Sequence, residues 1–177
     1  MNSTLKKIAS QRVIVVLLAV VLILSAFNTY LIFSGTQSAN RTNIVNYDFV
    51  LSKEGDNYNL KDVLTGYVSQ LSGDASTALN RALSQGNSVY LNPGIYTLTA
   101  NVQITNKLNA KIAGDGATLV GSGEKIVISG DDYTTSQYAL ISGLTLINVT
   151  VHVENSFATT IQNCKFINST IGIEFAN

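Results

Sequence analysis

Two groups of ionisable side chains in the C-terminal half of the chain have types and spacings that could support chemistry. The first is the pair Asp131 and Asp132, which follows Gly130. Paired carboxylates can cleave a glycosidic bond if their separation fits across a sugar. A segment rich in Asp also forms turns through its own side-chain hydrogen bonds, and we favour this structural interpretation.

The second group consists of His152, Glu154 and Glu174. If the chain around them forms neighbouring strands, the two glutamates should lie about 5 Å apart, and His152 about 7 Å away along its own strand. Such a group could hold a proton or a cation, so Glu154 and Glu174 are the candidate metal ligands and all three are candidate catalytic residues. A solvated row of exposed side chains is the alternative that we favour.

The composition excludes several classes of protein. Only 12% of the 177 residues are charged, against about 25% in an ordinary soluble domain. This excludes a charged disordered tail, a coiled coil and a polybasic nucleic-acid binder, so we expect no nucleic-acid partner. The single cysteine excludes a disulfide framework, and the single histidine leaves no histidine cluster for a metal. No cofactor is evident.

The segment 13–33 is long and apolar enough to cross a membrane. Its only polar residues are Ser25, Asn28 and Thr29, and as a helix it would be about 31 Å long. Because residues 1–12 are basic, we expect them in the cytoplasm and the remainder outside the cell. We therefore predict a transmembrane signal anchor that stays attached. A cleaved signal peptide, a pilin-like leader and a buried helix of a soluble core are the alternatives.

The next two segments predict a linker and an N-terminal module. Residues 34–46 are polar and indicate a flexible linker. Residues 47–87 predict three short strands followed by one helix. Asp74 is a typical N-cap residue, apolar residues follow it at helical spacing, and Gly86 should close the helix as its C′ residue.

From residue 88 to residue 177 short β-branched runs alternate with Asn, Gly, Ser and Thr, and the pattern repeats itself. Segment 141–154 aligns with segment 161–174 without gaps, and the identical positions include Asn148/Asn168 and Glu154/Glu174. A looser and earlier copy starts at Ala117, which aligns with Leu144. A period in the twenties with strands and no helices is typical of a β-solenoid, whose coils stack about 4.8 Å apart.

The repeat also predicts side-chain directions. The residues that should point into the core are Leu144, Leu146, Val151 and Val153 with their partners one coil later. The residues that should point outward are Thr145, Lys165, His152, Glu154 and Glu174. Asn148 and Asn168 occupy equivalent turns and could form an asparagine ladder. The sequence Gly114-Asp115-Gly116 predicts a turn.

Three motifs resemble a known superfamily. They are Asp74-Ala-Ser-Thr-Ala-Leu-Asn-Arg-Ala-Leu, Val89-Tyr-Leu-Asn-Pro-Gly-Ile-Tyr and Ile112-Ala-Gly-Asp-Gly-Ala-Thr-Leu. Together they are similar to the opening of the pectin-lyase-like right-handed parallel β-helix superfamily, which includes pectate lyases, polygalacturonases and phage tailspikes. The resemblance covers residues 74–177, and 47–73 more loosely. It implies an all-β fold, a right-handed parallel β-helix over 88–177 with an N-terminal capping helix.

The same resemblance implies chemistry on polysaccharides. Polygalacturonases carry Asn-Thr-Asp, Gly/Gln-Asp-Asp, His-Gly and Arg-x-Lys motifs, of which this chain has only the second, at Gly130-Asp131-Asp132. Lyases of the superfamily bind calcium through acidic residues and use an Arg or Lys base. By this resemblance Ca²⁺ could bind at Glu154 and Glu174, and Lys165 is the outward base nearest to them.

Three asparagines, Asn40, Asn148 and Asn168, begin glycosylation sequons. One asparagine cannot both carry a glycan and stack in a ladder, so we favour the ladder for Asn148 and Asn168. The sequence ends inside a coil, which predicts either a truncated β-helix or end-to-end self-association through the last coil.

Two functional hypotheses follow for a membrane-anchored protein outside the cell. The first is binding or processing of polysaccharide by a lyase or glycoside hydrolase whose catalytic part lies elsewhere, so that this chain alone is inactive. The second is a non-catalytic adhesin or structural stalk of the cell envelope that binds cell-surface glycans.

Overall fold

The computed structural model describes residues 46–132 and 134–174. The predicted membrane anchor, the linker up to residue 45 and the sequon at Asn40 lie outside the described residues. Within the described part of the chain, no helix has the length and apolar character needed to cross a membrane.

The described chain begins with an antiparallel sheet of three strands. These are β1 (Phe49–Glu54), β2 (Asn57–Asp62) and β3 (Val68–Ser72). β1 pairs with β2 and β2 with β3. Gly55 makes the β1–β2 turn with a φ of +60°, a conformation that glycine adopts without a steric cost. The predicted order of strand, turn and strand is confirmed.

One helix, α2 (Ala75–Gln85), follows this sheet. Asp74 is its N-cap, because its side chain accepts hydrogen bonds from the backbone N–H groups of Ser76 and Thr77. The face made of alanines and leucines is buried, as the helical spacing predicts. The prediction for Gly86 is wrong in detail: Gly86 is the C-cap, with an extended φ of −144°. Its lack of a side chain is needed because a Cβ there would lie 2.9 Å from the Cβ of Asp48.

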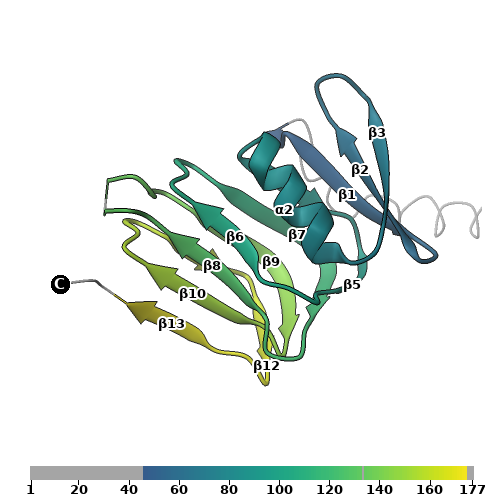
Figure 1. The fold of residues 1–177 in the computed structure, drawn as a ribbon. Helices are drawn as coiled ribbons and strands as arrows, with labels where there is room; N and C mark the ends of the chain where they lie inside the picture. The colour runs from purple at the N-terminus through teal and green to yellow at the C-terminus, as the bar shows by residue number, and fades with distance from the viewer. Residues whose placement is uncertain (1–45, 133, 175–177) are drawn as a thin grey trace, which may run out of the picture. The chain divides into compact units, whose positions relative to one another are not determined.

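The remaining strands wind into a β-solenoid of about four turns (Figure 1). One sheet extends from β1 through strands of each coil: β4 (Ser88–Leu91), β5 (Gly94–Thr97), β7 (Lys111–Val120), β9 (Leu140–Ile147), β11 (Thr160–Gln162) and β12 (Lys165–Ile167). The second sheet contains β6 (Val102–Thr105), β8 (Lys125–Ser129), β10 (Thr150–Glu154) and β13 (Ile171–Glu174). All strand pairs between coils are parallel.

The register of these pairs confirms the repeat. Val151 pairs with Ile171 and Ile141 with Ile161, the same matches that the ungapped alignment makes. Ala117 pairs with Leu144, as the looser copy predicts. The alignment of the sequence with itself therefore identified true neighbours in space.

The core of the solenoid consists of stacked apolar rows. One row passes from Ile104 through Ile128 and Val153 to Ile173 on four successive strands of the second sheet. The first three are buried and Ile173 is 65% exposed. The four residues predicted to point inward, Leu144, Leu146, Val151 and Val153, are all buried. Helix α2 packs over the first coil, where its alanines and leucines join the same core.

The prediction of a turn at Gly114–Gly116 is wrong, because these residues lie inside β7. The pairing of β7 with β9 jumps from Ala113 to Ala117, so that the glycine-containing stretch of β7 opposes only Gly143. This is a β-bulge, and the glycines permit it: Gly143 has a φ of +71°, and a Cβ on it would collide with the carbonyl oxygen of Gly114.

Tyr96, the last residue of the Pro-Gly-Ile-Tyr sequence, fixes the first coil to β1. Its ring is fully buried, and its hydroxyl donates to the carbonyl oxygens of Asn92 at 2.8 Å and Leu51 at 3.1 Å. Burial, with a smaller effect from Tyr58, raises the pKa of Tyr96 far above its ordinary value. The hydroxyl therefore stays neutral and acts as a structural donor.

Candidate functional site

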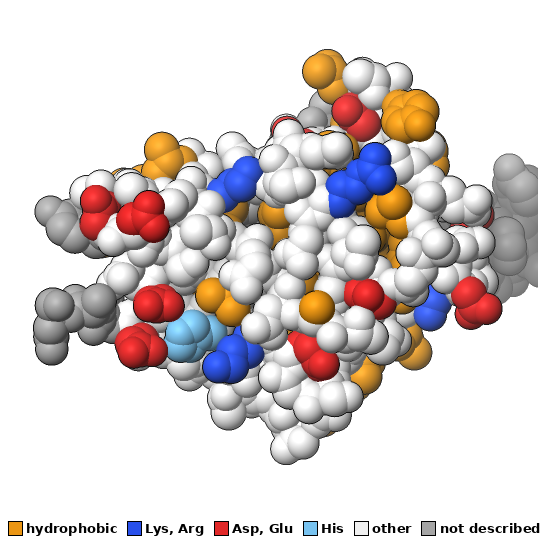
Figure 2. All heavy atoms as spheres, in the orientation of Figure 1, with side chains coloured by type: hydrophobic (Ala, Val, Ile, Leu, Met, Phe, Trp, Pro, Cys, Tyr) orange, Lys and Arg blue, Asp and Glu red, His pale blue; other side chains and the backbone are white. Residues whose placement is uncertain are grey.

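The structure brings both groups of candidate residues to one end of the second sheet. Asp131 and Asp132 follow the end of β8, Glu154 ends β10 and Glu174 ends β13. These three strands are neighbours, with Glu154 paired to Ser129 on one side and to Glu174 on the other. Figure 2 shows acidic side chains and the histidine gathered at the end of the face where these strands finish. The sequence did not predict that the two groups would share one edge.

His152 lies between the two glutamates. Its Nε2 atom is 3.9 Å from Oε2 of Glu154 and 3.7 Å from Oε2 of Glu174. On the next coil His152 pairs with Gly172, which has no side chain to cover the ring. The glutamate side chains are 42% and 67% exposed, so water screens their attraction to a protonated imidazole. The predicted outward directions and the pairing of the glutamates are confirmed.

The polar atoms of this histidine–glutamate group lie at the surface of the second sheet. The group offers four carboxylate oxygens and one imidazole, whereas Ca²⁺ takes six to eight oxygen ligands. Across residues 46–132 and 134–174, no set of three or more His, Cys, Asp and Glu side chains is arranged to hold a metal ion. Lys165, which by resemblance was the nearest base, is in β12 of the other sheet, where it pairs with Thr145. Calcium binding at Glu154 and Glu174 stays a prediction.

The aspartate pair is engaged in the turn that follows β8. Oδ1 of Asp132 accepts hydrogen bonds from the backbone N–H of Thr134 at 2.7 Å, the hydroxyl of Thr134 at 2.6 Å and the N–H of Thr135 at 3.1 Å. These bonds, the Thr134 hydroxyl first, lower the pKa of Asp132. Asp131 is bound twice to Asn106 of the preceding coil: its Oδ2 accepts from the Asn106 amide, and its backbone N–H donates to Oδ1 of Asn106, both at 2.9 Å. This geometry agrees with the turn that we favoured.

Two aromatic residues that sequence reasoning missed lie in the loops that follow β8 and β10. Tyr138 ends the loop that follows β8, and Phe157 lies in the turn that follows β10 and Glu154. Their rings are 6.2 Å apart and nearly perpendicular, yet the residues are 54% and 55% exposed. Leu108, also exposed, is linked to Phe157 through bridges to Gln137. We call Leu108, Tyr138 and Phe157 the aromatic corner. The sequence did carry a signal for them, since they are large apolar residues inside polar loops. They lie outside the aligned segments of the repeat, so the alignment does not bring them together.

A shallow groove lies over another turn of the solenoid. Its volume is about 360 Å³, and it is lined by glycines, hydroxyls and the side chains of Asn148 and Asn168. The two asparagines form the predicted ladder, since Nδ2 of Asn168 donates to Oδ1 of Asn148. The hydroxyls of Thr150 and Thr170, the third residues of the two sequons, also bond to each other at 3.2 Å.

Comparisons of the chain with protein-family models, curated proteins and solved structures found no match. The resemblance to the pectin-lyase-like superfamily rests on the three sequence motifs given above.

Proposed function

We propose that the chain is a glycan-binding module that holds polysaccharide on the outside of the cell without cleaving it. The observation that carries the proposal is the exposed pair Tyr138 and Phe157, whose rings contact each other and which lie in the loops that follow β8 and β10. The same two loops begin at carboxylates, at Asp131 and Asp132 after β8 and at Glu154 at the end of β10. A sugar ring has C–H groups on its faces and hydroxyls at its rim. An aromatic surface next to carboxylates and an imidazole complements both parts.

The solenoid suits an extended ligand. Its coils repeat, so side chains of one kind recur along one face and can contact successive units of a polymer. The aromatic corner draws on three successive coils, with Leu108, Tyr138 and Phe157. The two aromatic rings are exposed and contact each other, so they offer an apolar surface to a ligand.

Binding is favoured over cleavage by the state of the candidate catalytic groups. Oδ1 of Asp132 accepts three hydrogen bonds from Thr134 and Thr135, which lower its pKa, whereas glycoside hydrolysis needs a protonated carboxyl as the acid, so Asp132 does not suit that role. Lyase chemistry needs a base beside the substrate, and Lys165 lies on the other sheet. The adhesin or stalk hypothesis is therefore the form of glycan binding that we propose.

The finer classification is part of the same proposal. The helix over the first coil and the buried tyrosine of Pro-Gly-Ile-Tyr support membership of the pectin-lyase-like superfamily. A right-handed coil is supported by the general rule that parallel strands connect with right-handed crossovers.

The basic residues before segment 13–33 support a membrane anchor with the solenoid outside. Protease added to intact cells should then digest the solenoid, and full protection would contradict this location.

The test of glycan binding is affinity electrophoresis of the full chain through gels that contain a panel of soluble neutral and acidic polysaccharides. We expect retardation by at least one polymer and a loss of affinity of roughly tenfold in Tyr138→Ala/Phe157→Ala. Tyr67→Ala is the matched control, because Tyr67 is also an exposed aromatic residue but lies beside β3. No retardation by any polymer, or equal retardation of the double variant, contradicts the proposal.

An assay for turnover separates binding from processing. With polygalacturonate and calcium, we expect neither new reducing ends nor absorbance from unsaturated sugars. Turnover that disappears in Asp132→Ala or Glu154→Ala would contradict a purely binding role and support the enzyme hypothesis.

A further inference from the structure

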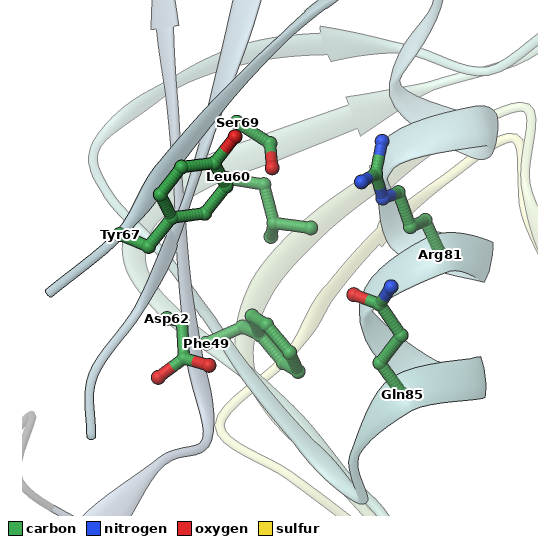
Figure 3. Close-up of a pocket in the computed structure, with 7 residues that line it drawn as sticks. All are labelled: Phe49, Leu60, Asp62, Tyr67, Ser69, Arg81 and Gln85. Carbon is green, nitrogen blue, oxygen red and sulfur yellow. The ribbon is translucent and has the colours of Figure 1, made fainter. Parts of the chain in front are cut away.

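A second cavity lies between the N-terminal sheet and helix α2, away from the aromatic corner. Its volume is about 310 Å³. Two apolar residues, Phe49 of β1 and Leu60 of β2, form its floor and are almost fully buried. Figure 3 shows Arg81 and Gln85 reaching toward it from the helix, with Tyr67 and Ser69 on the opposite side. Asp62, at the end of β2, completes the lining.

The helix supplies one polar wall of the cavity. Arg81 and Gln85 have the i and i+4 spacing, so they lie on one face of α2, one turn from each other. Their side chains have no hydrogen-bond or ion-pair partner among the residues that the structure describes. A guanidinium offers a planar fork of N–H donors that fits a carboxylate through two parallel hydrogen bonds. This wall therefore suits a carboxylate of a ligand.

The opposite wall carries the opposite charge. Oδ1 of Asp62 accepts a hydrogen bond from the backbone N–H of Thr65 at 2.8 Å, which leaves Oδ2 as an acceptor. Asp62 and Arg81 line the same cavity without forming an ion pair with each other. The ring of Tyr67, 68% exposed, stands on this side as an apolar surface. A positively charged or hydroxyl group of a ligand would be held here.

These features restrict the chemistry of the ligand. The negative charge of Asp62 would repel phosphate or any other dianion. A divalent cation would have a single carboxylate as its ligand and would be repelled by the guanidinium of Arg81 on the opposite wall. A cavity of this volume is at the small end of ligand sites, so it suits a small molecule better than a polymer. A ligand with a carboxylate, an ammonium group and an apolar portion satisfies both walls and the floor.

We propose that this cavity binds a small zwitterion, an α-amino acid with an apolar side chain. Its carboxylate contacts Arg81 and Gln85, its ammonium group contacts Asp62, and its side chain packs on Phe49, Leu60 and the ring of Tyr67. The site shares no residue with the aromatic corner, so the inference does not rest on the proposed glycan binding.

The test is titration of the full chain with L-leucine and L-phenylalanine, followed by calorimetry and by saturation-transfer NMR of the ligand. We expect saturable binding of at least one of them, weakened roughly tenfold or more in Arg81→Gln. Arg81→Lys should bind with intermediate affinity, because it keeps the charge and loses the fork. Asp62→Asn should also weaken binding, while its side-chain oxygen can still accept from Thr65. Tyr138→Ala, at the aromatic corner, is the control and should bind normally.

Two analogues of leucine test the two charges separately. Leucinamide lacks the carboxylate, and 4-methylpentanoate lacks the ammonium group, so both should bind roughly tenfold more weakly than leucine. Equal binding of 4-methylpentanoate would overturn the proposal of a zwitterion site. Absence of binding by both amino acids, or equal binding by Arg81→Gln, would overturn the site itself. Circular dichroism confirms that each variant is folded, which we expect because Arg81 is exposed.

Discussion

Asn168 donates a hydrogen bond from its side-chain Nδ2 to Oδ1 of Asn148, one coil earlier, at 2.6 Å. Both residues have left-handed backbone conformations, with φ values of +50° and +54°. Asparagine tolerates this conformation better than other residues with a side chain, and its amide can donate to one coil and accept from another. The same residue type thus serves the turn and the contact between coils.

Replacement of Asn168 separates these two roles. Asn168→Ala should lower the free energy of unfolding by about 1–3 kcal/mol, because it loses the hydrogen bond and strains the left-handed backbone. Asn168→Gly loses only the hydrogen bond and should cost less. Asn163 is the control, since it has a φ of +55° but lies outside the ladder. Urea unfolding should rank Asn168→Ala as more destabilising than Asn163→Ala, and equal losses would show that the ladder contributes nothing.

The close approach of Gly143 to Gly114 at the bulge predicts a larger loss of stability on substitution than the asparagine ladder does. In Gly143→Ala the new methyl group would collide with the carbonyl oxygen of Gly114, in addition to the strain of a φ of +71°. We expect a loss of about 2–5 kcal/mol, measured by urea unfolding. Gly55→Ala has a similar φ of +60° but no atom within 4 Å of the new Cβ, so it should lose only about 1–2 kcal/mol. Similar losses in the two variants would contradict the close approach of these coils.

The sequence predicted the structure best where a pattern of apolar and polar residues recurs from coil to coil. The repeat was visible because inward positions such as Val151 and Ile171 recur with the same polarity, and the structure pairs them. Gly114-Asp115-Gly116 has the local composition of a turn, but β7 pairs with β4 up to Gly114 and with β5 and β9 again from Ala117, so the segment lies inside a strand. No local pattern contains that information. Tertiary pairing overrides local turn preference in such a segment.

The features of the surface were harder to predict from the sequence than the fold. The row of His152, Glu154 and Glu174 was predictable, since register alone brings its members together. Tyr138 and Phe157 fall outside the aligned segments, so the repeat did not pair them. The cavity beside α2 is assembled from residues of β1, β2, β3 and α2, such as Asp62 and Arg81, whose approach follows from packing.

The N-cap of α2 predicts a pH dependence. Burial alone would raise the pKa of Asp74, but hydrogen bonds from Thr99, Ser76 and Thr77 outweigh it and lower the pKa. Because the folded state has the lower pKa, the stabilisation is present above the ordinary value of 3.8 and is lost as the pH falls through the folded value. Asp74→Ala should lose about 1 kcal/mol at neutral pH.

The comparison of variants at two pH values checks this assignment. The difference in unfolding free energy between the wild type and Asp74→Ala should shrink as the pH is lowered from 7 to about 3. Asp74→Asn is the control: it caps the helix nearly as well at neutral pH, and it removes the titrating group. A difference that stays constant down to acid pH would contradict the role of the ionised carboxylate.

The apolar row of the second sheet allows one residue type to be tested in two environments. Ile128, in β8, is fully buried between Ile104 and Val153, whereas Ile173, in β13, is 65% exposed. Ile128→Ala should lower the free energy of unfolding by about 2–5 kcal/mol, because it leaves a cavity between stacked coils. Ile173→Ala should lose less than about 1 kcal/mol, because little apolar surface is removed from water there. Urea unfolding of the two variants at several protein concentrations measures both losses of unfolding free energy. A loss at Ile173 that matches Ile128 and grows with concentration would mean that a second chain covers this coil.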